Sequence, residues 1–215
     1  MLYILFIAGV ALIGGMVGAI DRFKRRPPAR KRLRDAPLTT IAQVAEATDV
    51  RIEGIVEVVD GTKEAPVSGL RCVYYEHVAR EGGGRDGGLP WMPARVMHQA
   101  ANGLPFVVRD ATGYAIVDPT GATALLQVHQ HAERGTRPSA LEWADPTSSH
   151  RTGLKHLEYV IRPGDRLVVI GRAVREPDPD PATAAGGYRD GPAMRLRFTH
   201  SPQFPLQLVD PVRKR

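Results

Sequence analysis

Apolar and polar residues alternate with a period of two in several short segments of this chain. Such alternation is typical of a β-strand with one face in a core. In residues 50–58 the positions that share the apolar face are Val50, Ile52, Val56 and Val58. Gly54, in the middle of that segment, predicts a bulge or a tight bend. Further strands are expected at 71–79, 105–119, 165–174, 193–200 and 204–209.

The turn residues between these segments indicate the fold class. The 215 residues include 18 prolines and 22 glycines, a composition that favours many turns over a helical bundle. Residues 105–119 are expected to form a hairpin, with Asp110 and Gly113 at the ends of its turn. A short docked helix is expected at 40–47, where Thr40 and Gln43 have the spacing of a capping box. The sequence therefore predicts a mainly β fold, a small curled barrel or sandwich with an OB-like form among the options, and short helices.

Residues 2–20 contain no charged side chain. As a helix they would span about 28 Å, close to the thickness of a bilayer's hydrocarbon core. A cleavable signal peptide is the alternative, but its basic residues would precede the apolar run, and here they follow it. We therefore expect a transmembrane helix at 1–20, a basic juxtamembrane linker at 21–38 and a β-domain at 39–215.

The basic residues of the chain are concentrated next to this apolar run. Residues 21–34 carry eight Lys or Arg and one Asp, which leaves 21 basic and 22 acidic side chains elsewhere. The positive-inside rule then predicts a single-pass protein of the cell (inner) membrane, with the N-terminus outside and the β-domain in the cytoplasm. Basic side chains at 22–34 would lie against anionic lipid headgroups. Gly14 and Gly18 have the spacing of a weak helix-dimer contact.

Two stretches of the β-domain do not match a barrel wall. Residues 120–157 are expected to be an irregular, partly helical insertion, and residues 175–192 a loop rich in Pro and Asp. A third stretch, 80–88, is rich in glycine but lacks the lysine of a phosphate-binding loop. A functional insertion would therefore lie at 120–157.

Cys72 is the only cysteine of the sequence, so no intramolecular disulfide can form. If 71–79 is one strand, Cys72 and His77 point to opposite faces and cannot form a thiolate–imidazolium pair. A buried, inert thiol is therefore favoured over a catalytic nucleophile. No catalytic residue is identified.

Several histidines could in principle bind a metal ion. His129 and His131 would share a face of a strand, and His150 or His156 could supply a third ligand. The spacing matches no recognised metal motif, so solvated loop histidines are the favoured interpretation. We expect neither a metal nor a cofactor.

Four stretches, in this order and after an apolar segment, resemble the GIDE-type domain, also called the beside-a-membrane (BAM) domain. They are VRIEGIVEV, APVSGLRCVYYEHVAR, PFVVRDATGYAIVDP and IRPGDRLVVIGRAV. The family includes a mitochondrial membrane-anchored E3 ubiquitin ligase and also occurs in bacterial proteins. The resemblance implies a membrane-adjacent β-domain that docks a partner. Its motif positions, interpreted as structural, are Pro66, Gly69, Cys72, Tyr74, Tyr75, Asp110, Gly113, Asp118, Pro163, Gly164 and Gly171.

The sequence departs from that ligase in two respects. It shows no second apolar span and no RING finger, and its excess of Arg (24) over Lys (5) suggests a bacterial member. The favoured function is accordingly a membrane-anchored cytoplasmic binding or adaptor module for an unknown protein or small ligand. Activity as a ubiquitin-protein transferase is the alternative that the family label implies. A nucleic-acid-binding barrel is the third candidate function. The only pattern that favours it is Arg195 and Arg197 beside Phe198. No nucleic-acid partner is expected.

Overall fold

The computed structural model describes residues 35–46, 48–81, 95–133, 154–179 and 194–211. Contacts divide the chain into two units, Met1–Pro37 and Leu38–Arg215, and the fold described below lies in the second. Within the described ranges no helix is long and apolar enough to cross a membrane. The expected transmembrane helix at 1–20 and most of the basic linker lie outside these ranges.

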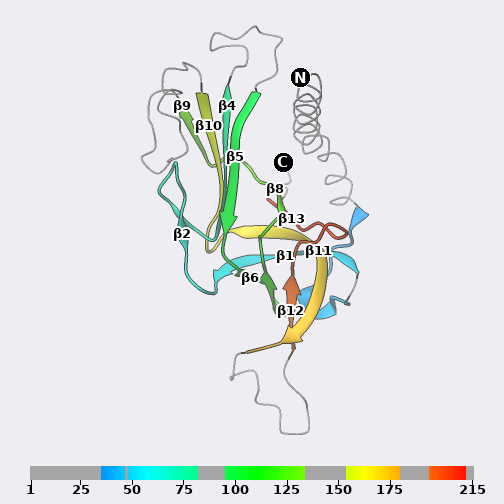
Figure 1. Cartoon of the computed structure of the whole chain (residues 1–215). Coiled ribbons are helices and arrows are strands. Elements are labelled where there is room, and N and C mark those ends of the chain that lie inside the picture. Colours follow the sequence, from blue (N-terminus) through cyan, green and yellow to red (C-terminus); the bar gives the residue numbers. More distant parts are fainter. Residues whose placement is uncertain (1–34, 47, 82–94, 134–153, 180–193, 212–215) are drawn as a thin grey trace, which may run out of the picture. The chain divides into compact units, whose positions relative to one another are not determined.

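Five strands close into a barrel. They are β1 (Asp49–Val58), β6 (Phe106–Arg109), β7 (Tyr114–Val117), β12 (Met194–Phe198) and β11 (Arg166–Pro177). The strands are hydrogen-bonded in the order β1-β6-β7-β12-β11, and the pairing of β1 with β11 closes the ring. All neighbours are antiparallel except β7 and β12, which are parallel. The predicted mainly β fold is confirmed in its barrel form (Figure 1).

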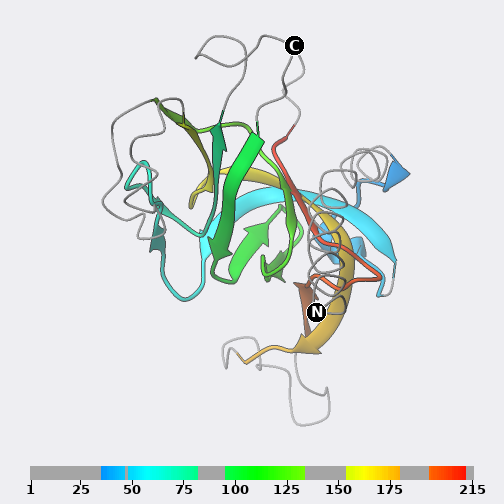
Figure 2. The same cartoon turned by 45° about the horizontal axis from the view of Figure 1, so that its top comes forward.

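The first strand changes partner along its length, which lets it curl across the barrel (Figure 2). Its first part, Asp49 to Ile55, pairs with β11, and its last part, Ile55 to Val58, pairs with β6. A Cβ atom at Gly54 would lie 2.4 Å from the carbonyl oxygen of Arg109, so only glycine fits at this crossing. The pairing register runs through Gly54 without a shift, so the glycine marks a tight approach and not a bulge.

The barrel interior is filled by the apolar faces that the period-two pattern predicts. Phe106 and Phe198 are among the largest fully buried side chains. Val58 is an exception, because it is 40% exposed at the end of β1, and Met194 at the start of β12 is likewise 46% exposed. Other buried core residues are Val50, Ile52, Val56, Val108, Ala115, Val117, Leu167, Val169, Leu196, Leu206 and Leu208.

A second, four-stranded sheet is built from excursions of the chain between barrel strands. Its order is β5 (Arg95–Gly103), β4 (Tyr74–Glu81), β10 (Leu154–Ile161) and β9 (Gln130–Glu133). β4 and β5 arise between β1 and β6, whereas β9 and β10 arise between β7 and β11. The described part of the predicted irregular insertion at 120–157 is therefore mostly strand. Residues 134–153 lie outside the described ranges.

Three further predictions need correction. Segment 71–79 is two strands, β3 (Arg71–Cys72), which pairs with β2 (Lys63–Glu64), and β4. Val73 lies between them. Its N–H donates to the carbonyl of Ile161 and its carbonyl accepts the N–H of Leu104, so Val73 does not pair with β2. The predicted helix at 40–47 is one 3-10 turn, η1 (Ile41–Gln43), without a side-chain cap. The loop predicted at 175–192 begins later, because β11 runs to Pro177, and residues 180–193 lie outside the described ranges.

The predicted strand at 204–209 is confirmed as β13 (Gln207–Val209). It pairs with β11 and, in parallel, with β8 (Thr123–Leu125). These two short strands extend the barrel sheet to seven strands. The residues that follow them, Gln127 and Asp210, lie together at the cavity described next.

Candidate functional site

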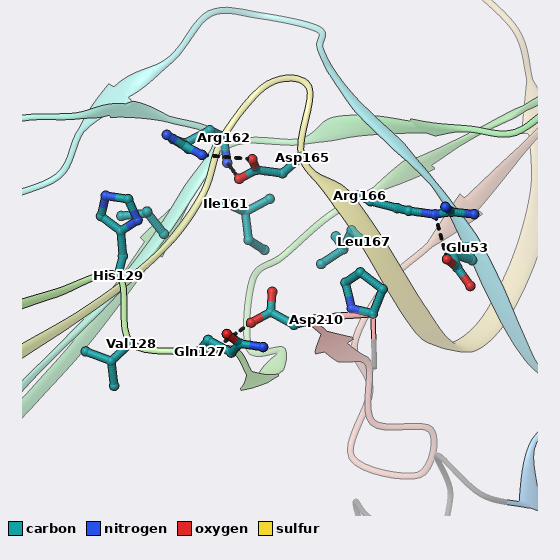
Figure 3. A pocket seen from close by; sticks show the side chains of 12 residues that line it. Glu53, Gln127, Val128, His129, Ile161, Arg162, Asp165, Arg166, Leu167 and Asp210 are labelled. Carbon is teal, nitrogen blue, oxygen red and sulfur yellow. Dashed lines mark hydrogen bonds and ion pairs between the residues drawn. The ribbon is translucent and has the colours of Figure 1, made fainter. Parts of the chain in front are cut away.

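A cavity of about 650 Å³ lies where the barrel meets the strands of the second sheet (Figure 3). It is lined from β1, from the end of β10, from the start of β11 and from the segments that follow β8 and β13. Its apolar wall comes from Val128, Val160, Ile161, Leu167 and Pro211. Its polar and charged lining residues are Glu53, Gln127, His129, Arg162, Asp165, Arg166 and Asp210.

The turn between β10 and β11 positions two of these charges. The Asp165 side chain accepts the backbone N–H of Arg162 at 2.8 Å and also pairs with its guanidinium at 3.2 Å. Gly164 has φ +86°, a conformation that favours glycine. Its N–H donates to the backbone carbonyl of Val56 at 2.8 Å. The N–H of Val56 donates in turn to the carbonyl of Asp165 at 2.9 Å. The predicted Arg-Pro-Gly-Asp turn, with Pro163 in it, is thus fixed to the barrel wall.

A second ion pair and a half-buried carboxyl complete the charged lining. Arg166 pairs with Glu53 at 2.6 Å on the barrel side of the cavity. The Asp210 side chain accepts the backbone N–H of Gln127. Burial, together with the negative charge of Asp165, raises the pKa of Asp210 above its ordinary value, although the Gln127 hydrogen bond opposes this shift. The cavity therefore presents both signs of charge to a ligand.

The functional groups of the lining are carboxylates, guanidinium groups, an amide and an imidazole. None of its twelve residues is a Ser, Thr, Cys, Lys or Tyr, the usual side-chain nucleophiles apart from carboxylates and histidine. Both of its guanidinium groups are engaged with carboxylates. In the ranges that the structure describes, no three His, Cys, Asp or Glu side chains are placed to hold a metal ion.

Cys72, the residue singled out in the sequence, lies away from this lining. Its side chain is fully buried, and its thiol donates to the carbonyl of Lys63 at 3.6 Å. Burial, followed by the negative charge of Glu158, raises the pKa of Cys72 to about 11. The thiol is therefore protonated near neutral pH, which agrees with an inert cysteine. The reason differs from the one predicted, because Cys72 and His77 belong to different strands.

The two aspartates of the family motif stabilise turns. Asp110 accepts the N–H groups of Gly113 at 3.0 Å and Ile41 at 2.8 Å. Burial opposes its ionisation, but these bonds and those from Thr112 outweigh burial and lower the pKa of Asp110. Burial likewise opposes ionisation of Asp118, and bonds from Thr120 and Arg197 lower its pKa. Asp110 thus joins the turn between β6 and β7 to the 3-10 turn η1.

Other motif positions also support packing. Tyr74 is buried in the core cluster, whereas Tyr75, on the other face of β4, is partly exposed. A Cβ atom at Gly171 would lie 3.0 Å from the Leu206 side chain, so β11 and the segment before β13 approach closely there. Burial, followed by the charge of Glu76, raises the pKa of Tyr74.

The structure describes the side chains of two of the four histidines considered as metal ligands. His129 lines the cavity, whereas His156 contacts His77 with 3.0 Å between Nδ1 and Nε2. His131 lies on β9 with its side chain outside the description, and His150 lies outside the described residues. The contact between His77 and His156 was not predicted, because the pairing of β4 with β10 is non-local.

Glu158 has a structural role that the sequence did not predict. Its side chain is fully buried on β10 and accepts the N–H groups of Val67 at 2.7 Å and Ser68 at 2.9 Å. It thereby holds the turn from Pro66 to Gly69, where Gly69 has φ +68°. No local signal marks this role, since the turn is some 90 residues away along the chain.

A family comparison agrees with these structural features. The GIDE family model, described as E3 ubiquitin ligase, matches residues 88–183. The resemblance to GIDE-type domains is confirmed. The GIDE match runs from before β5 to beyond β11, so it includes the Asp110 hairpin and the Arg162–Asp165 turn, while the Cys72 segment precedes it. Comparisons with curated proteins and with solved structures give no match.

Proposed function

We propose that this chain is a membrane-anchored binding or adaptor module of the GIDE type. Its ligand occupies the cavity of Figure 3 and carries charges of both signs, as a polar peptide segment or a zwitterionic small molecule does. The observation that carries this proposal is the lining itself. Two arginines and three carboxylates surround a cavity of about 650 Å³, a size typical of ligand sites, and twelve lining residues supply no Ser, Cys or Lys nucleophile.

The barrel topology supports a binding role by analogy. Numbered within the barrel alone, the strands β1, β6, β7, β11 and β12 follow the order 1-2-3-5-4-1, with the third and fifth parallel. This is the strand order of an OB-like barrel, a fold that often binds oligomeric ligands. Because fold alone does not establish function, the cavity remains the stronger argument.

The proposed location rests on the N-terminal sequence. The uncharged run at 2–20 anchors the chain in the cell (inner) membrane, and the basic run at 21–34 keeps the β-domain on the cytoplasmic side. The same basic side chains contact anionic headgroups, and Gly14 with Gly18 offers a weak contact between two anchors. A partner held in the cavity would thus be recruited to the membrane surface.

Site-specific photo-crosslinking in membranes of expressing cells tests the binding site. We expect benzoylphenylalanine at the exposed cavity residue Gln127 to give discrete adducts, and the same group at exposed Val174, which lies outside the lining, to give none. The Gln127 adducts should weaken when Asp165→Asn removes one lining charge. Equal adducts from both positions, or adducts insensitive to Asp165→Asn, would contradict the proposal.

A ubiquitin-ligase activity is the second candidate, because the family model carries that description. A RING surface is built around two zinc ions held by about eight Cys and His ligands, whereas these 215 residues include one Cys. A discharge assay with a ubiquitin-charged conjugating enzyme decides between the two. Stimulated discharge by the full chain would favour the ligase, and we expect none above background.

The structure lends little support to the third candidate, nucleic-acid binding. Arg195 pairs with Glu176 at 2.6 Å, and Arg197 pairs with Asp118 at 3.1 Å. Both basic side chains of the predicted aromatic–basic pattern are therefore neutralised by neighbours. A phosphate backbone would have to displace these carboxylates.

A further inference from the structure

Three histidines from adjacent strands meet on one face of the four-stranded sheet. His77 lies on β4, His98 on β5 and His156 on β10. In the strand register, His98 and His156 both lie opposite Ala79, one on each side, and His77 lies two residues from Ala79 on the same face. The small side chain of Ala79 leaves room above it for the imidazoles.

The rings are in close contact. His77 Nε2 and His156 Nδ1 are 3.0 Å apart, and their rings stack with centroids 5.2 Å apart at an interplanar angle of 11°. The His98 ring centroid lies 6.1 Å from that of His77, tilted by 40°. His77 is 1% exposed and Ala79 is fully buried, whereas His98 and His156 are partly exposed. We call His77, His98 and His156 the histidine cluster.

Other titratable groups lie on the strands that carry the histidine cluster. Glu158 lies directly opposite His77 in the register, but its two oxygens are engaged by the Val67 and Ser68 N–H groups. The titratable neighbour on the same face of β4 is Tyr75. Groups at positions of the reverse face are Tyr74, Glu76, Arg80, Lys155 and Tyr159, and side chains of β9 are outside the description.

The titration behaviour agrees with the geometry. Burial, followed by His156 and His98, lowers the pKa of His77 to about 4, and burial lowers the pKa of both neighbours. An opened sheet would return these side chains to water, where histidine titrates near pH 6.5. The open form therefore binds more protons between these values, and opening becomes more favourable as the pH falls below about 6.5.

We propose that the histidine cluster is an acid-sensitive lock on the edge strand β5. Neutral imidazoles pack across β5, β4 and β10 and hold them together. One added proton can be shared by His77 and His156, whereas a second places two positive charges about 5 Å apart, one of them on the buried His77. Among the described strands β5 pairs with β4 alone, and the register shifts between Ala79 and Arg80 beside His98, so this edge should open first. The lock is independent of the ligand proposed above.

Hydrogen exchange of the full chain in detergent, corrected for intrinsic rates, tests the lock. Between pH 7.5 and pH 5 we expect protection of peptides from β4 and β5 to fall at least tenfold, while peptides from β1 and β11 keep theirs. His77→Phe, which retains an aromatic ring without a titrating group, should reduce this difference severalfold, because His98 and His156 still titrate. His200→Gln, at a partly exposed histidine outside the cluster and the cavity lining, should retain it in full.

Several results of these exchange experiments would contradict the lock. Unchanged protection of β5 at pH 5, an equal loss in the barrel strands, or a pH response as large in His77→Phe as in the unmodified chain would overturn the proposal. If His77→Phe does not fold, His98→Gln at the partly exposed edge serves instead, and it should move the β5 transition to lower pH. A pH response that changes on addition of a chelator would assign the cluster to metal binding and also overturn the lock.

Discussion

Replacing Glu158 by alanine is expected to detach the turn from Pro66 to Gly69 from the four-stranded sheet. The carboxylate accepts two backbone N–H groups, from Val67 at 2.7 Å and Ser68 at 2.9 Å. Hydrogen bonds to a charged acceptor contribute about 1.5–3 kcal/mol each. Loss of both would cost about 3–6 kcal/mol.

Two effects reduce this figure. Removal of a buried carboxylate relieves its desolvation, and the partly exposed Val67 and Ser68 N–H groups can regain water once the turn moves. We therefore expect Glu158→Ala to lower the free energy of unfolding by about 3 kcal/mol. Glu158→Gln keeps one carbonyl acceptor and should cost about half as much.

Urea unfolding of the full chain in detergent, followed by circular dichroism, measures these differences. Glu57→Ala is the matched control, because Glu57 is a carboxylate in an exposed ion pair with Arg109. Such surface pairs contribute less than about 1 kcal/mol. If Glu158→Ala costs no more than Glu57→Ala, the two hydrogen bonds do not hold the turn and the reasoning fails.

Three further outcomes follow from the structure. The Cys72 thiol should react with a soluble disulfide reagent at pH 8 only after denaturation, since it is fully buried with its pKa raised to about 11; fast labelling of the folded chain would contradict this. Gly54→Ala should lower the free energy of unfolding in urea by about 1–3 kcal/mol, because its Cβ would lie 2.4 Å from a backbone oxygen. Gly113→Ala is the control; its Cβ would lie 3.4 Å from the nearest atom, and it should lower that free energy by less than about 1 kcal/mol. For the proposed topology, Gln203→Cys in a Cys72→Ala background should be labelled by an impermeant reagent in permeabilised cells, and labelling of intact cells would place the β-domain outside.

The barrel strands could be predicted because each has an inner face of Val, Ile, Leu or Phe. The segments 50–58, 105–119, 165–174 and 193–200 all correspond to barrel strands. The alternation of apolar and polar residues is enough to predict these strands, because a strand with one buried face requires that pattern.

The second sheet was harder to predict, because polar groups lie on its buried face. β10 carries His156 and Glu158 where apolar residues would be expected, and β5 carries small and polar residues such as Ala100 and Asn102 on an edge. The break at Val73 depends on hydrogen bonds to distant residues. The cavity could not be foreseen for the same reason, since its lining comes from five separate segments of the chain.

Chemical-shift mapping of the isotope-labelled full chain in detergent tests the binding site most directly. The probe is the dipeptide Arg-Glu, which carries both charges, and Gly-Gly is the control without charged side chains. We expect Arg-Glu to shift amide signals of residues 127–129, 160–167 and 210, which line or adjoin the cavity, and Asp165→Asn to weaken this response. Absence of shifts at these residues, or equal shifts with Gly-Gly, would contradict the assignment of the cavity as a site for a ligand of mixed charge.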